Sequence, residues 1–121
     1  MVMENISPND WQWPEELDAL VAAPMHHSLL LENKFVRVIE TIILPGEITA
    51  IHTHQWPAAL TIISWSDFIR YDGKGNITAD SRNLSETKRN GTALWSEPLK
   101  PHSLKNVGDK IIHIISTEIK I

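Results

Sequence analysis

The sequence of 121 residues contains no cysteine, which excludes disulfide bonds, thiolate metal ligands and cysteine nucleophiles. It also has no surplus of basic residues, since 11 lysines and arginines stand against 15 aspartates and glutamates. The resulting net charge of −4 argues against a nucleic-acid partner. No apolar run is long enough to span a bilayer, and the first residues do not resemble a secretion signal. We therefore expect a soluble, cytoplasmic protein that binds neither nucleic acid nor membranes.

The composition is that of one folded domain, because hydrophobic residues make up 42% of the chain. Residues 1–27 are predicted to form an N-terminal arm with a short helix. Pro14 followed by two glutamates is typical of a helix start, and Pro24 ends the helical pattern. Residues 28–121 have the residue pattern of a β-rich domain.

This second part consists of short stretches rich in β-branched, leucine and aromatic residues, several of them separated by turn residues. The predicted strands cover residues 28–31, 35–44, 48–54, 58–65, 67–71, 91–95, 102–106 and 110–121. Many short strands at this spacing favour an all-β sandwich or barrel. The polar segment 77–90 is predicted to be a mobile surface loop, with a charged edge strand as the alternative.

Six histidines are the residues most indicative of chemistry. His52 and His54 are two positions apart in a predicted strand, so their side chains point to the same face. Neighbouring imidazoles need partners if they are buried, and one metal ion satisfies both because neutral imidazole is the commonest metal ligand. Taken alone, such a pair is also compatible with an ordinary polar surface.

A wider spacing pattern surrounds this pair. Five residues separate a turn glycine from the pair; downstream, a second glycine precedes a histidine by eleven positions and an asparagine by fifteen. These residues are Gly46, His52, His54, Gly91, His102 and Asn106. The spacing resembles the two sequence motifs of the cupin superfamily, over roughly residues 30–118. The resemblance implies a jelly-roll barrel, or double-stranded β-helix, in which His52, His54 and His102 bind one divalent metal ion.

The sequence departs from the cupin pattern at several positions. The glutamate of the first motif is expected at position 58 or 59, where the chain has Ala58 and Ala59. Ser66 and Leu99 stand where glycines are expected, and Pro98 is one residue late. Without the carboxylate the ion keeps three neutral ligands and its full double charge, which increases its attraction for an anion. Some cupin dioxygenases also use three histidines and no glutamate.

Other residues are candidates for the missing acid or for additional ligands. Glu40 lies in the middle of a predicted strand and could be a fourth ligand or a general base if it points inward; the alternative is that it faces solvent or pairs with a nearby base. His113 is expected to be a core or interface histidine. His26 and His27 could reach the pocket mouth, but a surface position is the expectation.

Strand alternation predicts which residues contact a substrate. Trp56 shares the side of the chain that carries the histidines, and Ala59 and Thr61 are predicted to point inward on the next strand. Together they suggest a mostly apolar small-molecule pocket. Core packing or a dimer seam is the alternative for Trp56, as for Trp65 and Trp95.

Three functional hypotheses follow from these residues. The first is a metal-dependent enzyme of the dioxygenase type, acting on a small organic substrate, with iron preferred and zinc, manganese, nickel or copper as alternatives. The second is a non-catalytic metal- or small-molecule-binding module, a sensor or carrier. The third is a barrel whose role is assembly. A homodimer is expected in any case, with the arm carrying Trp11 and Trp13 as a possible swapped element.

Overall fold

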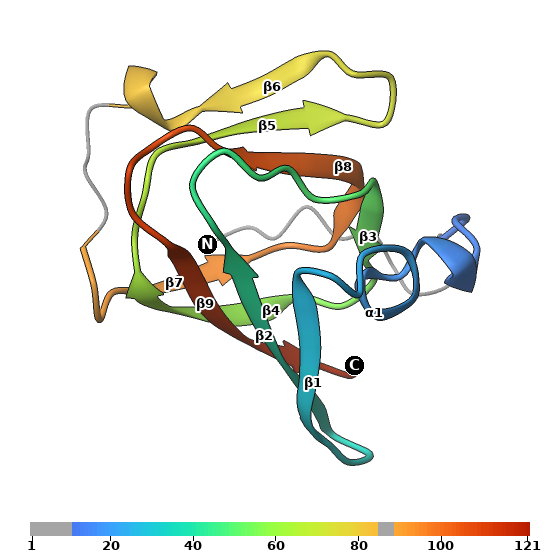
Figure 1. Ribbon diagram of the computed structural model, residues 1–121. Helices are drawn as coiled ribbons and strands as arrows, with labels where there is room; N and C mark the ends of the chain where they lie inside the picture. The colour runs from blue at the N-terminus through green and yellow to red at the C-terminus, as the bar shows by residue number, and fades with distance from the viewer. Residues whose placement is uncertain (1–10, 85–88) are drawn as a thin grey trace.

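The computed structural model describes residues 11–84 and 89–121, in which short strands form two facing sheets (Figure 1). The strands are β1 (His27–Glu32), β2 (Val36–Ile43), β3 (His52–His54), β4 (Ala58–Ser64), β5 (Phe68–Asp72), β6 (Ile77–Asp80), β7 (Ala93–Ser96), β8 (Leu99–Asn106) and β9 (Ile112–Ile119). The larger sheet has the order β1-β2-β9-β4-β7 and the smaller one β3-β8-β5-β6, with antiparallel pairing throughout. The predicted all-β barrel is confirmed.

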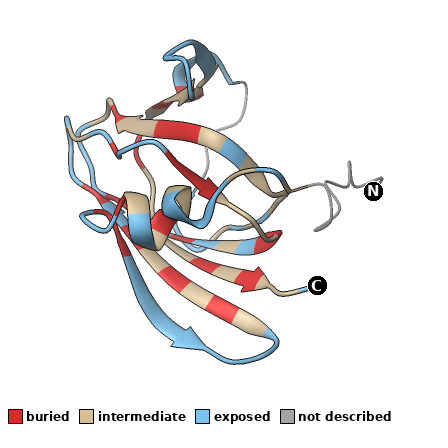
Figure 2. Cartoon of the chain, turned by 90° about the vertical axis from the view of Figure 1, so that its right-hand side faces the viewer, coloured by how far each residue is buried: buried red, intermediate tan, exposed pale blue. Residues whose placement is uncertain are grey.

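The core lies between the sheets and follows from strand alternation. In β2, buried residues alternate with more exposed ones along the strand, and β9 repeats much of this pattern (Figure 2). The largest fully buried apolar side chains among the described residues are Ile39, Ile43, Ile62 and Ile112, all on the larger sheet. Since isoleucine is stiff and packs well on a pleated surface, these four residues fix which face of the sheet points inward.

The N-terminal segment forms two short helices instead of the single one expected. A 3-10 helix, η2 (Glu15–Leu17), is followed by α1 (Ala19–Ala22). The break falls at Asp18, whose side chain accepts a hydrogen bond from the backbone N–H of Leu20 and caps α1. No helix among the described residues is long and apolar enough to cross a bilayer.

The polar segment 77–90 also differs from the expected loop. Ile77–Asp80 form β6, the edge strand of the smaller sheet, and η3 (Ser81–Asn83) follows it. The alternative, a charged edge strand, is therefore the correct one for these residues, while residues 85–88 lie outside the described chain. The predicted strand at 48–54 is shorter than expected: only His52–His54 form β3, and Ile48 makes an isolated bridge to Lys105.

Two motif residues hold the barrel turns in place. Gly46 has a φ of 84°, a left-handed conformation that glycine adopts without strain. Asn106 is fully buried, and its side-chain amide donates to the carbonyl oxygens of Ile43 and Lys110. Its side-chain oxygen accepts from the Ser66 hydroxyl and the Gly108 N–H. The asparagine of the motif therefore cross-links three connections and has a structural role.

Candidate metal centre

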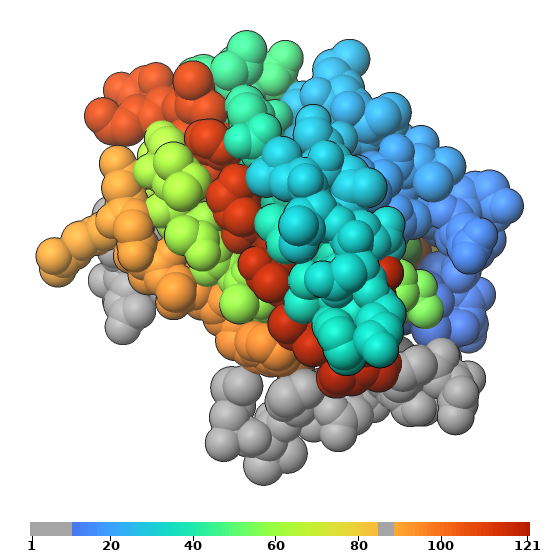
Figure 3. Space-filling view, turned by 90° about the horizontal axis from the view of Figure 1, so that it is seen from below, coloured from blue at the N-terminus to red at the C-terminus, as the bar shows by residue number. Residues whose placement is uncertain are grey.

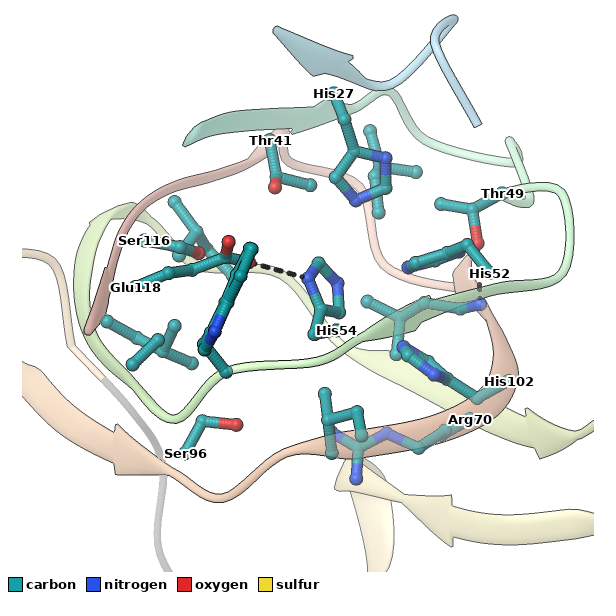
Figure 4. Close-up of a pocket in the computed structure, with 17 residues that line it drawn as sticks. His27, Thr41, Thr49, His52, His54, Arg70, Ser96, His102, Ser116 and Glu118 are labelled. Carbon is teal, nitrogen blue, oxygen red and sulfur yellow. Dashed lines mark hydrogen bonds and ion pairs between the residues drawn. The ribbon is translucent and has the colours of Figure 1, made fainter. Parts of the chain in front are cut away.

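Four histidines from three strands meet inside the barrel (Figure 4). His52 and His54 come from β3, His102 from β8 and His27 from the start of β1. His52 and His102 are direct cross-strand partners with ring centroids 4.4 Å apart, and the His54 ring lies 5.6 Å from that of His102. The His27 ring lies 4.5 Å from that of His52. The predicted triad is thus brought together, and a fourth histidine joins it.

The spacing of the ring nitrogens suits one metal ion. One nitrogen from each of His27, His52 and His54 lies within 4.8 Å of the other two. Small side-chain rotations bring such a group around a single ion, because metal–nitrogen bonds are about 2.1 Å long. His102 packs directly against His52 from the neighbouring strand.

Hydrogen bonds fix the tautomer of all four rings. The Nδ1 atoms of His52 and His102 lie 2.7 Å from the carbonyl oxygens of Ala50 and Lys100. The Nδ1 of His27 lies 3.0 Å from the Ala23 carbonyl oxygen. Since a carbonyl oxygen can only accept, each Nδ1 carries the proton, and Nε2 is left with a free lone pair. The Nδ1 of His54 is fixed in the same manner by a carboxylate, so all four imidazoles are held through Nδ1.

Burial keeps these donors unprotonated. Desolvation lowers the pKa of His52 to about 2, and the neighbouring His54 lowers it further in the same direction. Burial followed by the proximity of His54 likewise lowers the pKa of His102 to about 3 and that of His27 to about 4. Three of the four rings are therefore neutral at physiological pH, which is the form that binds metal.

Among the described residues, the only carboxylate that lines this site comes from β9. Glu118 is fully buried, and its Oε2 accepts a hydrogen bond from Nδ1 of His54 at 3.1 Å. Its Oε1 accepts from Nε of Arg37 at 2.7 Å, and Arg37 in turn makes two hydrogen bonds to Asp18. Burial lowers the pKa of Arg37, but the hydrogen bonds to Asp18 and Glu118 outweigh it and raise the pKa overall. Glu118 is thus positioned to orient His54, as carboxylates beside metal-binding histidines do.

Glu118 lies next to one of the two positions where the motif glutamate is missing. Ala58 on β4 is the direct cross-strand partner of Glu118, and both line the cavity. Since Ala58 stands where the motif acid is expected, the carboxylate lies one strand away from the usual position. A glutamate at 58 and one at 118 would place two buried acids side by side.

The cavity beside the histidines has a volume of about 90 Å³. Trp56 lies on its wall as predicted, and the Arg37 guanidinium stacks over the indole ring at 5.0 Å. The prediction for Ala59 and Thr61 was wrong in register. Both are exposed on the outer face of β4, whereas Ala58 and Leu60 point into the cavity. The prediction takes Ala59 as the first inward-pointing residue of β4, whereas the residues that point into the cavity begin with Ala58.

The remaining candidates lie elsewhere. Glu40 pairs with His113 at 2.8 Å and borders a groove outside the barrel, so it is not a fourth ligand; the alternative, a pairing with a nearby base, is the correct one. His26 is buried instead of exposed, with Glu47 3.4 Å from its Nε2. The surface position expected for His27 was also wrong, since this residue is 5% exposed and lines the cavity.

Sequence reasoning missed four residues of the site: His27, Arg37, Arg70 and Glu118. Each interrupts or borders an apolar strand with a polar side chain, a pattern that marks either a solvent face or a functional interior. The strand pairing distinguishes the two cases. It places Arg37 and Ala58 on either side of Glu118, which shows that these polar side chains belong to the interior.

The two facing sheets and the enclosed histidines define a double-stranded β-helix with a candidate metal centre. Neither the scan against protein-family models nor the search of curated proteins finds a match. Among solved structures, the chain is similar to a cupin domain from Bordetella pertussis Tohama I, with 19% identity, a TM-score of 0.63 and coverage of 78% of this chain and 92% of that one.

Two further structures support the same fold. A conserved Klebsiella pneumoniae protein with a double-stranded β-helix domain has 19% identity, a TM-score of 0.54 and coverage of 98% and 90% of the two chains. An RmlC-like cupin family protein from Methanocaldococcus jannaschii has 12% identity, a TM-score of 0.53 and coverage of 77% and 79%. The chain therefore has the double-stranded β-helix fold of these cupin structures, which is the fold that the motif resemblance implies.

Proposed function

We propose that this protein binds one divalent metal ion through His52, His54 and His102, with His27 as a fourth ligand. The observation that carries the proposal is the shared tautomer: a fixed acceptor holds each Nδ1, so all four Nε2 lone pairs are available. Burying four imidazoles together has a large desolvation cost, and a bound cation offsets it.

The donor set limits the choice of metal. Imidazole nitrogens suit iron, zinc, copper and nickel, whereas manganese prefers more oxygen ligands. Iron is the metal we propose if the site carries out oxygen chemistry. A bound ion would supply Lewis-acid or redox chemistry to a small organic molecule seated in the cavity.

We infer a dioxygenase-type reaction as the first role and a non-catalytic binding module as the second. The apolar wall and the small cavity suit a small organic substrate. The second role is favoured by Glu118, whose two oxygens both accept hydrogen bonds, so the one carboxylate that lines this cavity among the described residues is not free to act as a base. In either role Glu118, Arg37 and Asp18 orient His54 and link the site to α1.

Metal titration of protein stripped with a chelator tests the proposal. We expect one equivalent of zinc or iron(II) to bind, measured by calorimetry and elemental analysis, and His52→Ala and His27→Ala to weaken binding at least tenfold. His113→Ala is the matched control, because this histidine pairs with Glu40 on the outer face. Failure of the wild type to bind any of iron, zinc, copper, nickel or manganese would contradict the proposal. Oxygen uptake by the loaded protein with a substrate panel separates the two roles.

We also infer that two copies associate through β1. All residues of this edge strand after His27 are exposed, among them Leu29, Leu30 and Leu31 (Figures 2 and 3). An exposed apolar edge strand is a liability that a second copy of the same chain relieves by covering it. Light scattering should show a dimer that Leu30→Glu dissociates, while Ile77→Glu on the edge of the other sheet leaves it intact. A monomeric wild type would contradict the inference.

A further inference from the structure

Arg70 is a cation that lines the barrel cavity, and its Nε has no hydrogen-bond partner among the described residues. It lies on β5 opposite Leu104 of β8, and cross-strand partners share a face, so both point into the cavity that holds the histidines. Figure 4 shows the Arg70 side chain beside His102. Its Nε is buried, and no described residue makes a hydrogen bond or an ion pair with it. Burial lowers the pKa of Arg70, which reflects the cost of keeping this charge in the barrel.

The contrast with Arg37 shows that this state is not a general feature of the interior. Arg37 lines the neighbouring groove and is bound by two carboxylates, Asp18 and Glu118. The nearest acid on the strand of Arg70 is Asp72, but the Asp72 side chain accepts from the backbone N–H groups of Lys74 and Asn76 in its own turn. A buried guanidinium without an anion is costly, and arginine is suited to binding a carboxylate through two parallel hydrogen bonds.

We propose that Arg70 anchors an anionic ligand, a small aliphatic carboxylate, in the cavity beside the metal centre. This inference rests on the proposed metal site for the second contact of the ligand, but the arginine contact itself does not require the metal. Leucine and isoleucine side chains, including Leu60, Leu99 and Ile114, form much of the remaining wall and suit an aliphatic tail. The volume of about 90 Å³ admits a molecule of only a few water-sized groups.

The site has the charge balance that such a ligand needs. The four histidines are donors without charge in their metal-binding form, and the charge of Glu118 is matched by Arg37. Arg70 therefore adds a positive charge that nothing in the described site cancels. With a divalent ion bound, the excess positive charge grows, so the pocket discriminates by charge: a carboxylate is attracted to both cations, whereas the neutral amide of the same shape gains no charge–charge attraction from either.

The test compares butyrate with butyramide, which has nearly the same shape and no charge. Binding is measured by calorimetry and by ligand-observed NMR, with zinc-loaded and metal-free protein. We expect butyrate to bind at least tenfold more tightly than butyramide, and Arg70→Met to abolish this preference in the metal-free protein while changing zinc affinity less than threefold. Arg82→Met is the matched control, because Arg82 pairs with Asp80 on the exposed edge strand.

A structural role for Arg70 would give a different pattern. If the guanidinium has no partner in the free protein, Arg70→Met should fold with a urea midpoint equal to or higher than that of the wild type. A lower midpoint, or equal binding of butyrate and butyramide to the wild type, overturns the inference. Butyrate binding to metal-free protein that depends on Arg70 supports it even if no metal binds, so the two proposals fail separately. Displacement of butyrate by inorganic phosphate with equal affinity would overturn the assignment to a carboxylate.

Discussion

The buried histidines predict a steep loss of stability in mild acid for the metal-free protein. In the unfolded chain, His27, His52 and His102 take up a proton near the ordinary histidine pKa of 6.5, whereas in the folded protein their pKa values are about 4, 2 and 3. Because the unfolded state binds more protons between these limits, the stabilisation is fully present above pH 6.5. It is lost as the pH falls towards the folded-state values.

The magnitude follows from the linkage relation. At pH 5.5 each unfolded histidine gains about 1.4 kcal/mol from protonation, while the three folded rings remain almost entirely neutral. Three rings therefore remove about 4 kcal/mol of the free energy of unfolding between pH 7.5 and pH 5.5, a large part of the total for a domain of this size. The carboxylates with lowered pKa values, Asp72 and Asp80, titrate below this window and do not contribute to it.

Urea unfolding in the presence of a chelator, followed by tryptophan fluorescence at pH 7.5, 6.5 and 5.5, measures this loss. His27→Gln provides the internal check, because removing one titrating ring should reduce the loss by about a third. Zinc in excess should raise the midpoint at pH 7.5 and have a smaller effect at pH 5.5, since protons compete with the metal for the ligands. A wild-type loss below 1 kcal/mol over this range would refute the reasoning that the rings are buried and neutral.

Three other substitutions have defined outcomes. Asn106→Leu should lower the free energy of unfolding by about 3–5 kcal/mol in urea denaturation, because four buried hydrogen bonds lose their partner. Glu40→Gln should leave zinc affinity within twofold of the wild type by calorimetry, since Glu40 pairs with His113 outside the barrel; a tenfold loss would contradict its placement. Ala58→Glu should destabilise the protein by about 2–4 kcal/mol in thermal or urea unfolding through repulsion of Glu118, and Glu118→Ala should restore most of it.

The strands and the motif residues could be predicted from sequence because their signals are local. Alternation in β2 and β9, and the turn at Gly46, reflect the preferences of neighbouring residues. The spacing of His52 and His54 fixes a common face in any strand. The prediction failed at Ala59 and Thr61 for the same reason: a shift of one residue in the assumed start reverses every side chain, and only pairing with β9 and β7 fixes the register.

The residues that complete the site could not be predicted, since each acts through a contact distant in sequence. Glu118 meets His54 across 64 residues and Arg37 across 81 residues. His27 reaches the cluster because the chain enters β1 directly from α1, whose end supplies the carbonyl of Ala23 that holds the ring. No periodicity in the sequence carries this information.

The position of Glu118 accounts for the charge of the site better than the absence of a motif glutamate does. A carboxylate at position 58 would point at the metal and neutralise part of its charge. At position 118 the carboxylate instead receives hydrogen bonds from Arg37 and His54, so its charge is balanced before a metal binds. A bound ion would therefore keep its full double charge among neutral ligands, in the same cavity as Arg70, whose Nε has no hydrogen-bond partner among the described residues. With a metal bound, such a site would have more positive charge than its own described residues neutralise, which is the basis for the proposed anionic ligand.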